Sequence, residues 1–269
     1  RDYLLDRRLI AADAIASIAH ARMLDEVGLL REGDLVSLER ELRSIALEAV
    51  GDGDAAGDRG ASDVPSVPTP IVIRPDQEDG HTWIEERLVD RLGEAGKRIH
   101  TGRSRNDQVL ASTRLFAREG VLCVQTSLAN AIDALQGLAE AHERTPMPGR
   151  THMQPAMPST VGLWAASYAE ALIDAETALA NAYELLNRSP LGAAASYGVP
   201  LPLDRELVAG LLGFREVHHN VLWAVSSRGQ TELVLLEALD GIGLVLGRLA
   251  SDLIVYTLPE FGYFTLPAE

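Results

Sequence analysis

The sequence is short of cysteine and of aromatic residues. Cys123 is the one cysteine among 269 residues, so no disulfide can form within the chain. Its neighbours are apolar and helix-like, which predicts a small buried hydrophobic side chain rather than a reactive thiol. Aromatic residues make up only 5% of the chain, and Ala and Leu supply most of its 46% hydrophobic content. Because Ala and Leu are strong helix formers, this composition favours an all-α protein.

Basic residues and long apolar runs are also scarce. The 24 Lys and Arg residues stand against 39 Asp and Glu, a formal net charge of −15. Binding to nucleic acid needs clustered basic side chains, so we expect no nucleic-acid partner. No apolar run has the length that spans a membrane, and no basic segment followed by an apolar run opens the chain. We therefore expect no membrane partner and a cytoplasmic location, although a start at Arg1 leaves an upstream segment open.

Apolar residues recur at helical spacing over most of the chain. This spacing predicts helices within 7–50, with a stop at Gly28, and over 82–94. Three longer helices are predicted from Asp107 to about Arg144, from about Ser159 to Asn187, and from about His219 to Tyr256. Long helices of this kind pack as a bundle with shallow crossing angles. Residues 51–80 are instead rich in Gly, Asp, Ser and Pro, and predict either a functional lid or a tolerated surface loop.

The first polar cluster precedes the first long helix, at residues 101–108. Its two arginines, Arg103 and Arg105, can hold a carboxylate through paired hydrogen bonds. Ser104 or Asn106 can cap the helix that follows, and a helix start attracts anions. The alternative interpretation is a capped helix with a solvated charge pair.

The second cluster is Thr151, His152 and Gln154, in a segment rich in proline. A histidine titrates near neutral pH and can act as a general acid or base, although a loop histidine can equally be structural. Pro158 and Ser159 suit the start of the next helix.

The third cluster comes at the start of the last long helix. Asn220, Ser227 and Arg228 lie seven or eight positions apart, which places them on one face of a continuous helix, with Ser226 beside them. Such a polar face either lines a cleft or forms a solvated stripe.

Four ordered segments carry a family resemblance. They are AADAIASIAHARMLDEVGLL (11–30), HTGRSRNDQV (100–109), GRTHMQPAMP (149–158) and SPLGAAASYGVPLPLDRE (189–206). Together they resemble the argininosuccinate lyase family of the fumarase/aspartase superfamily. The resemblance covers nearly the whole chain except about 52–76, and HTGRSRNDQV is its most specific part.

The resemblance implies an all-α fold with a small N-terminal domain, a central bundle of long helices and a small C-terminal domain. We therefore predict an N-terminal helical domain over 1–102, with the insert at about 51–80, and an incomplete bundle domain over 103–269. The family assembles as a homotetramer whose active sites are each built from three subunits. Its reaction is the reversible β-elimination of argininosuccinate to arginine and fumarate, without a metal or organic cofactor.

The resemblance also implies roles for individual residues. His152 matches the catalytic histidine of the family. The positions that match its substrate-binding residues are Ser17, Ser104, Arg105, Asn106, Thr151 and Gln154. The positions that match site-supporting residues are Asp13, Asn220, Ser226 and Arg228. Asp79 and His81 match a family segment as well, with a structural role equally open for them.

The chain departs from the family pattern in two places. The family's Gly-Ser-Ser loop, which carries a catalytic serine and a lysine, is expected just after the last residues and is not within the 269 residues. We therefore expect the chain to be a portion of a longer protein; a natural end at Glu269 would predict an inactive fragment or one half of a split enzyme. Arg228 is followed by Gly229, where relatives usually carry Asp. Loss of this carboxylate would loosen a supporting ion pair and weakens the assignment to an arginine-specific lyase.

Two other functions compete with this interpretation. A sister lyase, such as one acting on adenylosuccinate, would share the fold, but the string TGRSRNDQ argues against it. A catalytically inactive, crystallin-like scaffold would also share the fold. The presence of Asn106, Thr151 and His152 favours the enzyme.

Overall fold

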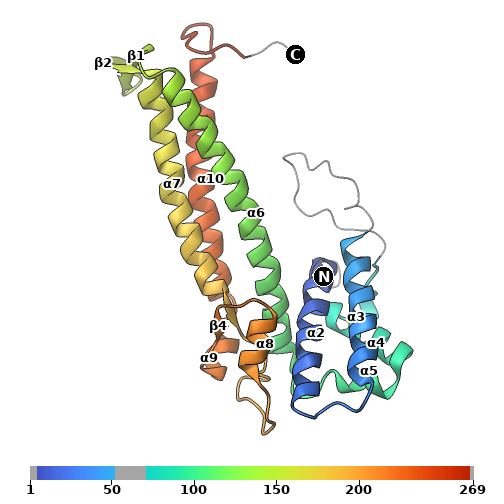
Figure 1. The fold of residues 1–269 in the computed structure, drawn as a ribbon. Coiled ribbons are helices and arrows are strands. Elements are labelled where there is room, and N and C mark those ends of the chain that lie inside the picture. The colour runs from blue at the N-terminus through green and yellow to red at the C-terminus, as the bar shows by residue number, and fades with distance from the viewer. Residues whose placement is uncertain (1–4, 52–70, 267–269) are drawn as a thin grey trace. The chain divides into compact units, whose positions relative to one another are not determined.

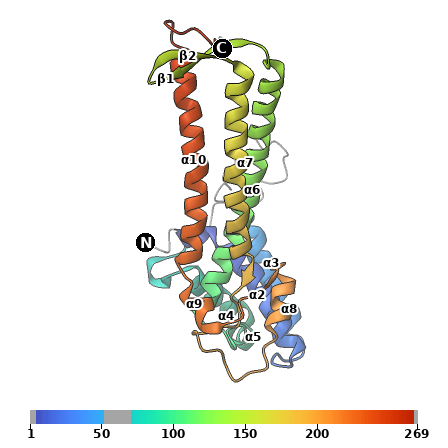
Figure 2. The same ribbon diagram turned by 90° about the vertical axis from the view of Figure 1, so that its left-hand side faces the viewer.

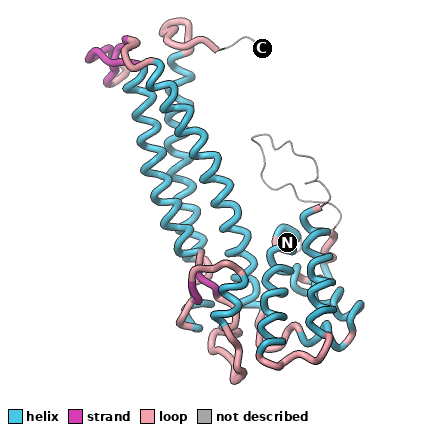
Figure 3. The backbone as a smooth tube through the Cα atoms, in the orientation of Figure 1, coloured by secondary structure: helices cyan, strands magenta, loops and turns pink. Residues whose placement is uncertain are grey.

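The computed structural model describes residues 5–51 and 71–266 of the chain. Helices dominate, as predicted, and the strands are short (Figure 3). The structure divides into two compact units, one formed by residues 1–119 with 185–229 and the other by 120–184 with 230–269. Each unit is described by itself below. None of the described helices is long and apolar enough to cross a membrane.

The first unit contains most of the short elements (Figure 1). In chain order these are η1 (Asp6–Arg8), α2 (Ile10–Glu26), α3 (Asp34–Val50), η3 (Pro75–Gln77), α4 (Gly80–Leu92), α5 (Glu94–Arg98), the start of α6 (Arg105–Ala141), β3 (Arg188–Ser189), α8 (Arg205–Leu211), β4 (Glu216–Val217) and α9 (Val221–Ser226). β3 and β4 pair in parallel. As predicted, α2 ends before Gly28, whose φ of 73° lies in the left-handed region that favours glycine.

Helix α2 is the centre of the first unit, because it is buried on two sides. One side joins a cluster with α3 and α4, through residues such as Ile10, Leu42 and Ile84. The other side, which includes Met23 and Leu24, joins a second cluster with the start of α6 and with α8. The frequent alanines of α2 let these neighbours approach closely.

Part of the predicted 51–80 insert is packed structure rather than loop. Residues 52–70 lie outside the described residues. Ile71 and Ile73, however, are 6% and 5% exposed and belong to the first apolar cluster, and α4 already begins at Gly80. The Gly- and Pro-rich composition concealed these two core residues.

The second unit consists of three long helices and a hairpin. The helices α6 (37 residues, from Gly120 onward in this unit), α7 (Val161–Leu186) and α10 (Gln230–Tyr256) run side by side (Figures 1 and 2). The hairpin strands β1 (Pro146–Thr151) and β2 (Gln154–Thr160) pair antiparallel. Cys123 lies on α6 and is exposed, so the prediction that this cysteine is buried is wrong.

Pro158 and Ser159 do not begin α7, contrary to prediction. They pair with Pro148 and Met147 in the hairpin. The helix begins at Val161, and Leu163 N donates to Thr160 Oγ1 over 3.0 Å. Thr160 is therefore the capping residue.

The last long helix is interrupted, contrary to the prediction of one helix from His219 to Tyr256. α9 ends at Ser226 and α10 begins at Gln230. Between them Gly229 has a φ of 88°, which a right-handed helix cannot contain. The local backbone conformation of this glycine breaks the helix.

Candidate active site

A polar stripe runs along the otherwise apolar helix α2. Asp13, Ser17 and His20 are spaced four and three residues apart, share one face, and are at most 2% exposed. Buried polar groups need hydrogen-bond partners, and each of these has one from another segment. His81 of α4, and residues of the 101–108 segment, supply them.

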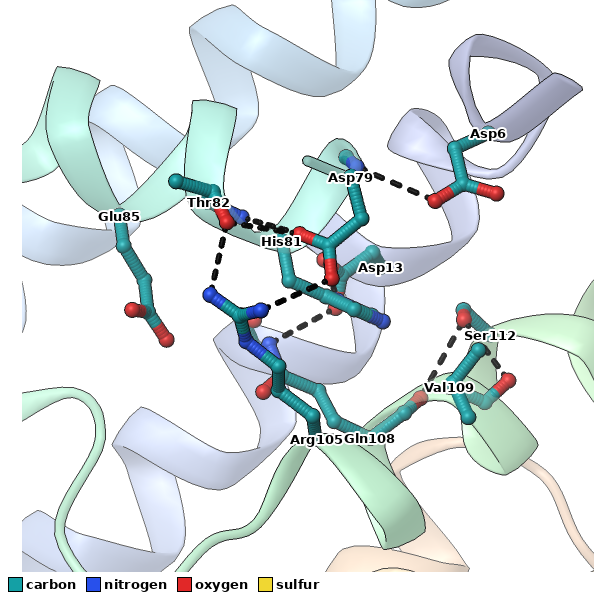
Figure 4. Close-up of polar contacts among 12 residues, drawn as sticks. Asp6, Asp13, Asp79, His81, Thr82, Glu85, Arg105, Gln108, Val109 and Ser112 are labelled. Atoms are coloured by element: carbon teal, nitrogen blue, oxygen red, sulfur yellow. Dashed lines mark hydrogen bonds and ion pairs between the residues drawn. The ribbon is translucent and has the colours of Figure 1, made fainter. Parts of the chain in front are cut away.

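Asp13 forms a buried pair with His81. His81 Nδ1 lies 2.6 Å from Asp13 Oδ2, and Gln108 Nε2 donates to Asp13 Oδ1 over 3.3 Å (Figure 4). Burial alone would raise the pKa of Asp13, but the charge and hydrogen bond of His81, helped by Arg103, lower it. Burial would likewise lower the pKa of His81, but Asp13 raises it. Both directions favour the ionised pair.

Arg103 reaches α2 next to this pair. Its Nη1 donates to Ser17 Oγ over 2.8 Å, and the arginine is 7% exposed. Burial lowers its pKa, against the attraction of Asp13. His20 Nε2 donates to Thr101 O over 2.9 Å. Burial, and then the charge of Arg103, hold the pKa of His20 well below its usual range. This imidazole is therefore neutral at physiological pH.

The start of α6 is capped by Ser104, as predicted. Ser104 Oγ accepts from the backbone N and the side-chain Nδ2 of Asn106, each at 3.3 Å. Asn106 lies inside the first turn and is exposed, so the alternative that Asn106 caps the helix is wrong. Ser104 is half-buried. The first turn of a 37-residue helix therefore presents exposed donors at its positive end.

Asp107 ties this turn to the segment 189–206. Its Oδ1 accepts from Ser104 N over 3.0 Å, and its Oδ2 accepts from Gly192 N and Ala194 N over 2.9 and 2.8 Å. Burial raises the pKa of Asp107, opposed by these three hydrogen bonds. Two motifs far apart in sequence are thus joined through one buried carboxylate.

Arg105 points toward α4 instead of toward the buried stripe. Its guanidinium lies 2.9 Å from Glu78 Oε2. It also lies 3.3 Å from Asp79 Oδ2 and donates to Thr82 Oγ1 over 2.7 Å (Figure 4). Asp79 also caps α4 through Thr82 N. Acidic side chains therefore already neutralise Arg105 in this arrangement.

The polar residues near α9 do not form the single polar face that was predicted, because they differ in exposure. Asn220 is exposed and caps α9 by accepting from Trp223 N over 2.9 Å. Ser226 and Arg228 are exposed as well. Ser227, by contrast, is 2% exposed and accepts from Arg114 Nη2 over 3.0 Å.

Arg114 is a buried centre of this region that sequence reasoning missed. It is 0% exposed and donates through Nη1 to Arg188 O over 2.7 Å and to His218 Nδ1 over 3.3 Å. Burial and then the charge of Arg114 lower the pKa of His218 to about 4. His218 is thus a neutral acceptor, and Arg114 joins α6, β3 and the segment before α10.

The second unit carries Thr151, His152 and Gln154 at the tip of the hairpin. Thr151 pairs with Gln154, which leaves a two-residue turn of His152 and Met153. Their φ angles are 50° and 65°, the geometry of a type I′ turn. Thr151, His152 and Gln154 are all exposed, and His152 has no hydrogen bond or ion pair to another described residue.

The predicted site residues thus fall into two groups. In the first unit Ser17 and Asp13 bond to Arg103 and Gln108, which flank the segment Ser104–Asn106, and Asn220, Ser226 and Arg228 lie at or next to α9. The second unit holds Thr151, His152 and Gln154. Among the residues that the structure describes, no group of three or more His, Cys, Asp or Glu side chains is placed to hold a metal ion.

Comparisons with known proteins agree on one family. The profile of a family described as lyase matches residues 55–269. Argininosuccinate lyase of Stenotrophomonas maltophilia (strain K279a) is 42% identical over 268 residues, and that of Sorangium cellulosum (strain So ce56) is 43% identical over 266. These alignments cover 100% and 99% of this chain but only 58% of each relative, so the chain spans little more than half their length.

Solved structures agree with the sequence comparison. EDDS lyase in complex with formate has a TM-score of 0.80 and 25% identity, over 95% of this chain and 46% of that one. Fumarate lyase from Mesorhizobium sp. BNC1 has a TM-score of 0.76 at 24% identity, over 94% of this chain and 56% of that one, which shows a shared fold. The chain belongs to the lyase family.

Proposed function

We propose that the protein to which this chain belongs is an argininosuccinate lyase, which eliminates fumarate from argininosuccinate and releases arginine. The observation that carries the proposal is the exposed turn of Thr151 and His152, which offers an imidazole with no partner among the described residues. The identity of 38–43% to curated argininosuccinate lyases, along essentially the whole chain, supports this choice of substrate.

The start of α6 suits the carboxylates of such a substrate. Ser104 caps the helix and Asn106 lies in its first turn, where backbone N–H groups and the helix dipole favour negative charge. β-Elimination passes through a carbanion beside a carboxylate, and donors placed beforehand stabilise the charge that develops. We assign this stabilisation to Ser104, Asn106 and, through its own hydroxyl, Thr151.

His152 is the acid–base group of the proposed reaction. A histidine side chain can accept a proton and return it, and the exposed position of this one leaves it open to a substrate. Ser17 and Gln154 are proposed to bind substrate, and Asp13, Asn220, Ser226 and Arg228 to support the site. Arg105 is also proposed to bind substrate, but its guanidinium already forms ion pairs with Glu78 and Asp79. A substrate carboxylate would have to compete with these two side chains for it.

The assembly belongs to the same proposal. The proposed residues occur in two units, and a homotetramer whose active sites draw on three subunits would bring different segments to one substrate. A cytoplasmic location and a reaction without metal or organic cofactor complete the proposal.

The proposal is tested by fumarate release from the full-length protein, offered argininosuccinate and adenylosuccinate separately. The informative variant is His152→Asn, because asparagine tolerates a φ of 50° and keeps the turn while removing the imidazole. His152→Ala serves as a second variant that also strains the turn. Ser226→Ala changes an exposed side chain of α9, in the other unit. This variant tests only the supporting role that is proposed for Ser226.

Release from argininosuccinate alone, lost in His152→Asn, is the expected outcome. Release from adenylosuccinate alone would assign the protein to a sister lyase. No release from either substrate by the intact, folded assembly would contradict the enzyme and leave the crystallin-like scaffold.

A further inference from the structure

The turn that carries His152 has an unfavourable backbone conformation for its residues. A type I′ turn needs positive φ at both central positions, which is why Asn-Gly is the preferred pair there. Here His152 and Met153 hold φ angles of 50° and 65°. Residues with a Cβ atom adopt this region only when the surrounding structure holds them there.

Arg150 supplies a contact that holds the turn. Its Nη1 donates to the carbonyl oxygen of Met153 over 3.1 Å, across the turn from its own strand. Its Nη2 donates to Tyr263 Oη over 2.8 Å, and its guanidinium lies 4.4 Å from the centre of the Phe261 ring. One planar cation thus links the turn to the segment that follows α10.

The segment at the other end of this link is itself well anchored. Tyr263 N and Phe264 N both donate to Tyr256 O, at the last residue of α10, over 2.9 and 3.2 Å. The Tyr263 ring packs on Tyr256 at 5.3 Å, and the Phe264 ring packs on Trp164 of α7 at 5.1 Å. Arg150 therefore connects the turn to the packed end of two long helices.

We propose that Arg150 is a positioning residue for His152, acting through the Met153 carbonyl and anchored by Tyr263. It orients the imidazole toward the reacting atoms without touching them. This inference rests on the proposed function. The sequence motif gave no such role to Arg150, because its anchor lies more than a hundred residues away, at Tyr263.

The experiment measures kcat and KM for fumarate release by the full-length wild type and four variants. Arg150→Gln removes the link, and Tyr263→Phe removes its anchor alone. Arg150→Gln combined with Met153→Gly replaces the link by a residue that adopts positive φ without help. Arg144→Gln is the matched control, since Arg144 is an exposed arginine just before the hairpin.

Arg150→Gln is expected to lower kcat about ten- to a hundredfold, as small misplacements of an acting group do, with KM changed less than about twofold. Tyr263→Phe should lower kcat by less, and Arg144→Gln should leave kcat unchanged. In the double variant, Met153→Gly should restore much of the kcat that Arg150→Gln loses. A role in overall stability alone would leave kcat of the folded protein unchanged in Arg150→Gln. Equal kcat in Arg150→Gln and wild type, or a loss that Met153→Gly leaves unchanged, would overturn the inference.

A second readout separates this inference from the proposed function. The imidazole NMR signals of His152, assigned by their loss in His152→Asn, should shift or broaden in Arg150→Gln and return with Met153→Gly. If the wild type releases no fumarate, the proposed function fails, while the NMR comparison still tests the positioning. His152 signals unchanged in Arg150→Gln would overturn the positioning in either case.

Discussion

At the scale of single residues, the first unit stabilises an ion pair inside its core. Asp13 and His81 are 2% and 5% exposed, and only 2.6 Å separates their closest atoms. Removing one partner from such a pair leaves the other charge buried without compensation. We therefore expect a substitution at either residue to lower the free energy of unfolding markedly, whether or not the residue takes part in the reaction.

His81→Gln is predicted to destabilise the protein by about 3–5 kcal/mol, because Asp13 remains buried without its counter-charge. A urea titration of wild type and variant measures this loss. His100→Gln is the matched control: His100 pairs with Glu85 at an exposed position, where we expect less than about 1 kcal/mol. A similar loss in both variants would show that burial of the Asp13 pair does not matter.

The same pair predicts a pH dependence of stability. The pKa of His81 is raised on folding, so its contribution is lost as pH rises through that raised pKa. The pKa of Asp13 is lowered, so its contribution is lost as pH falls through the lowered pKa. The unfolding free energy of wild type should therefore fall as pH rises above the ordinary pKa range of histidine, and this fall should be absent in His81→Gln. An identical slope in both proteins over that range would contradict the assignment.

At the scale of elements, the contact between α6 and α7 depends on one glycine. A Cβ atom on Gly162 would lie 2.7 Å from both Ala139 O and Glu143 Cα, and Gly162 N donates to His142 O. The first turn of α7 thus meets the end of α6 backbone to backbone. Such an approach leaves no room for a side chain.

Gly162→Ala is predicted to cost about 1–3 kcal/mol, because the two helix ends must move apart. Gly137→Ala is the control in α6: nothing lies within 4 Å of its Cβ position, so alanine should stabilise the helix by up to about 1 kcal/mol. Thermal unfolding of Gly162→Ala and Gly137→Ala measures both changes in stability. A stabilising Gly162→Ala would refute the close contact.

The break between α9 and α10 makes a separate prediction. A Cβ atom at Gly229 meets nothing within 4 Å, so substitution there tests its φ of 88° alone. Gly229→Ala should cost about 1–2 kcal/mol, and Gly229→Asn less, since asparagine tolerates the left-handed region. Equal stabilities of wild type and both variants in chemical unfolding would show that the break is not set by this residue.

At the scale of the whole molecule, α10 carries an exposed apolar face. Leu233, Leu236, Leu244 and Ile254 are 53–67% exposed and lie on one side of the helix. A face of this kind favours burial against another surface. It is consistent with the proposed homotetramer.

Leu244→Glu is predicted to weaken the proposed tetramer, because it places a charge in the middle of that face. Light scattering of the full-length protein after gel filtration measures the mass. Val36→Glu, 71% exposed on α3 of the first unit, should leave the tetramer intact. An unchanged tetramer in Leu244→Glu would exclude this face from the assembly.

Much of this architecture was predictable from local patterns, but the contacts between segments were not. Helical spacing placed the long helices, and residue chemistry left Ser104 or Asn106 as the cap, of which the structure shows Ser104. The hairpin was missed because its turn, His152–Met153, lacks the glycine or asparagine that usually signals one. The break at Gly229 was missed because an isolated glycine is tolerated in many helices.

The site shows the same limit. The stripe of Asp13, Ser17 and His20 has helical spacing on an apolar helix, and this signal could have identified His20 beforehand. The partners Arg103 and Arg114 could not be assigned, since their contacts come from segments up to 113 residues apart. The predicted domain division at residue 102 stays a prediction.

The measurement that tests the central claim most directly is the product ratio from argininosuccinate. The full-length protein and His152→Asn are incubated with this substrate, and arginine and fumarate are quantified in the same samples. A lyase releases the two in equal amounts, and His152→Asn should release neither at a comparable rate. Arginine without fumarate, or equal release by both proteins, would contradict the account.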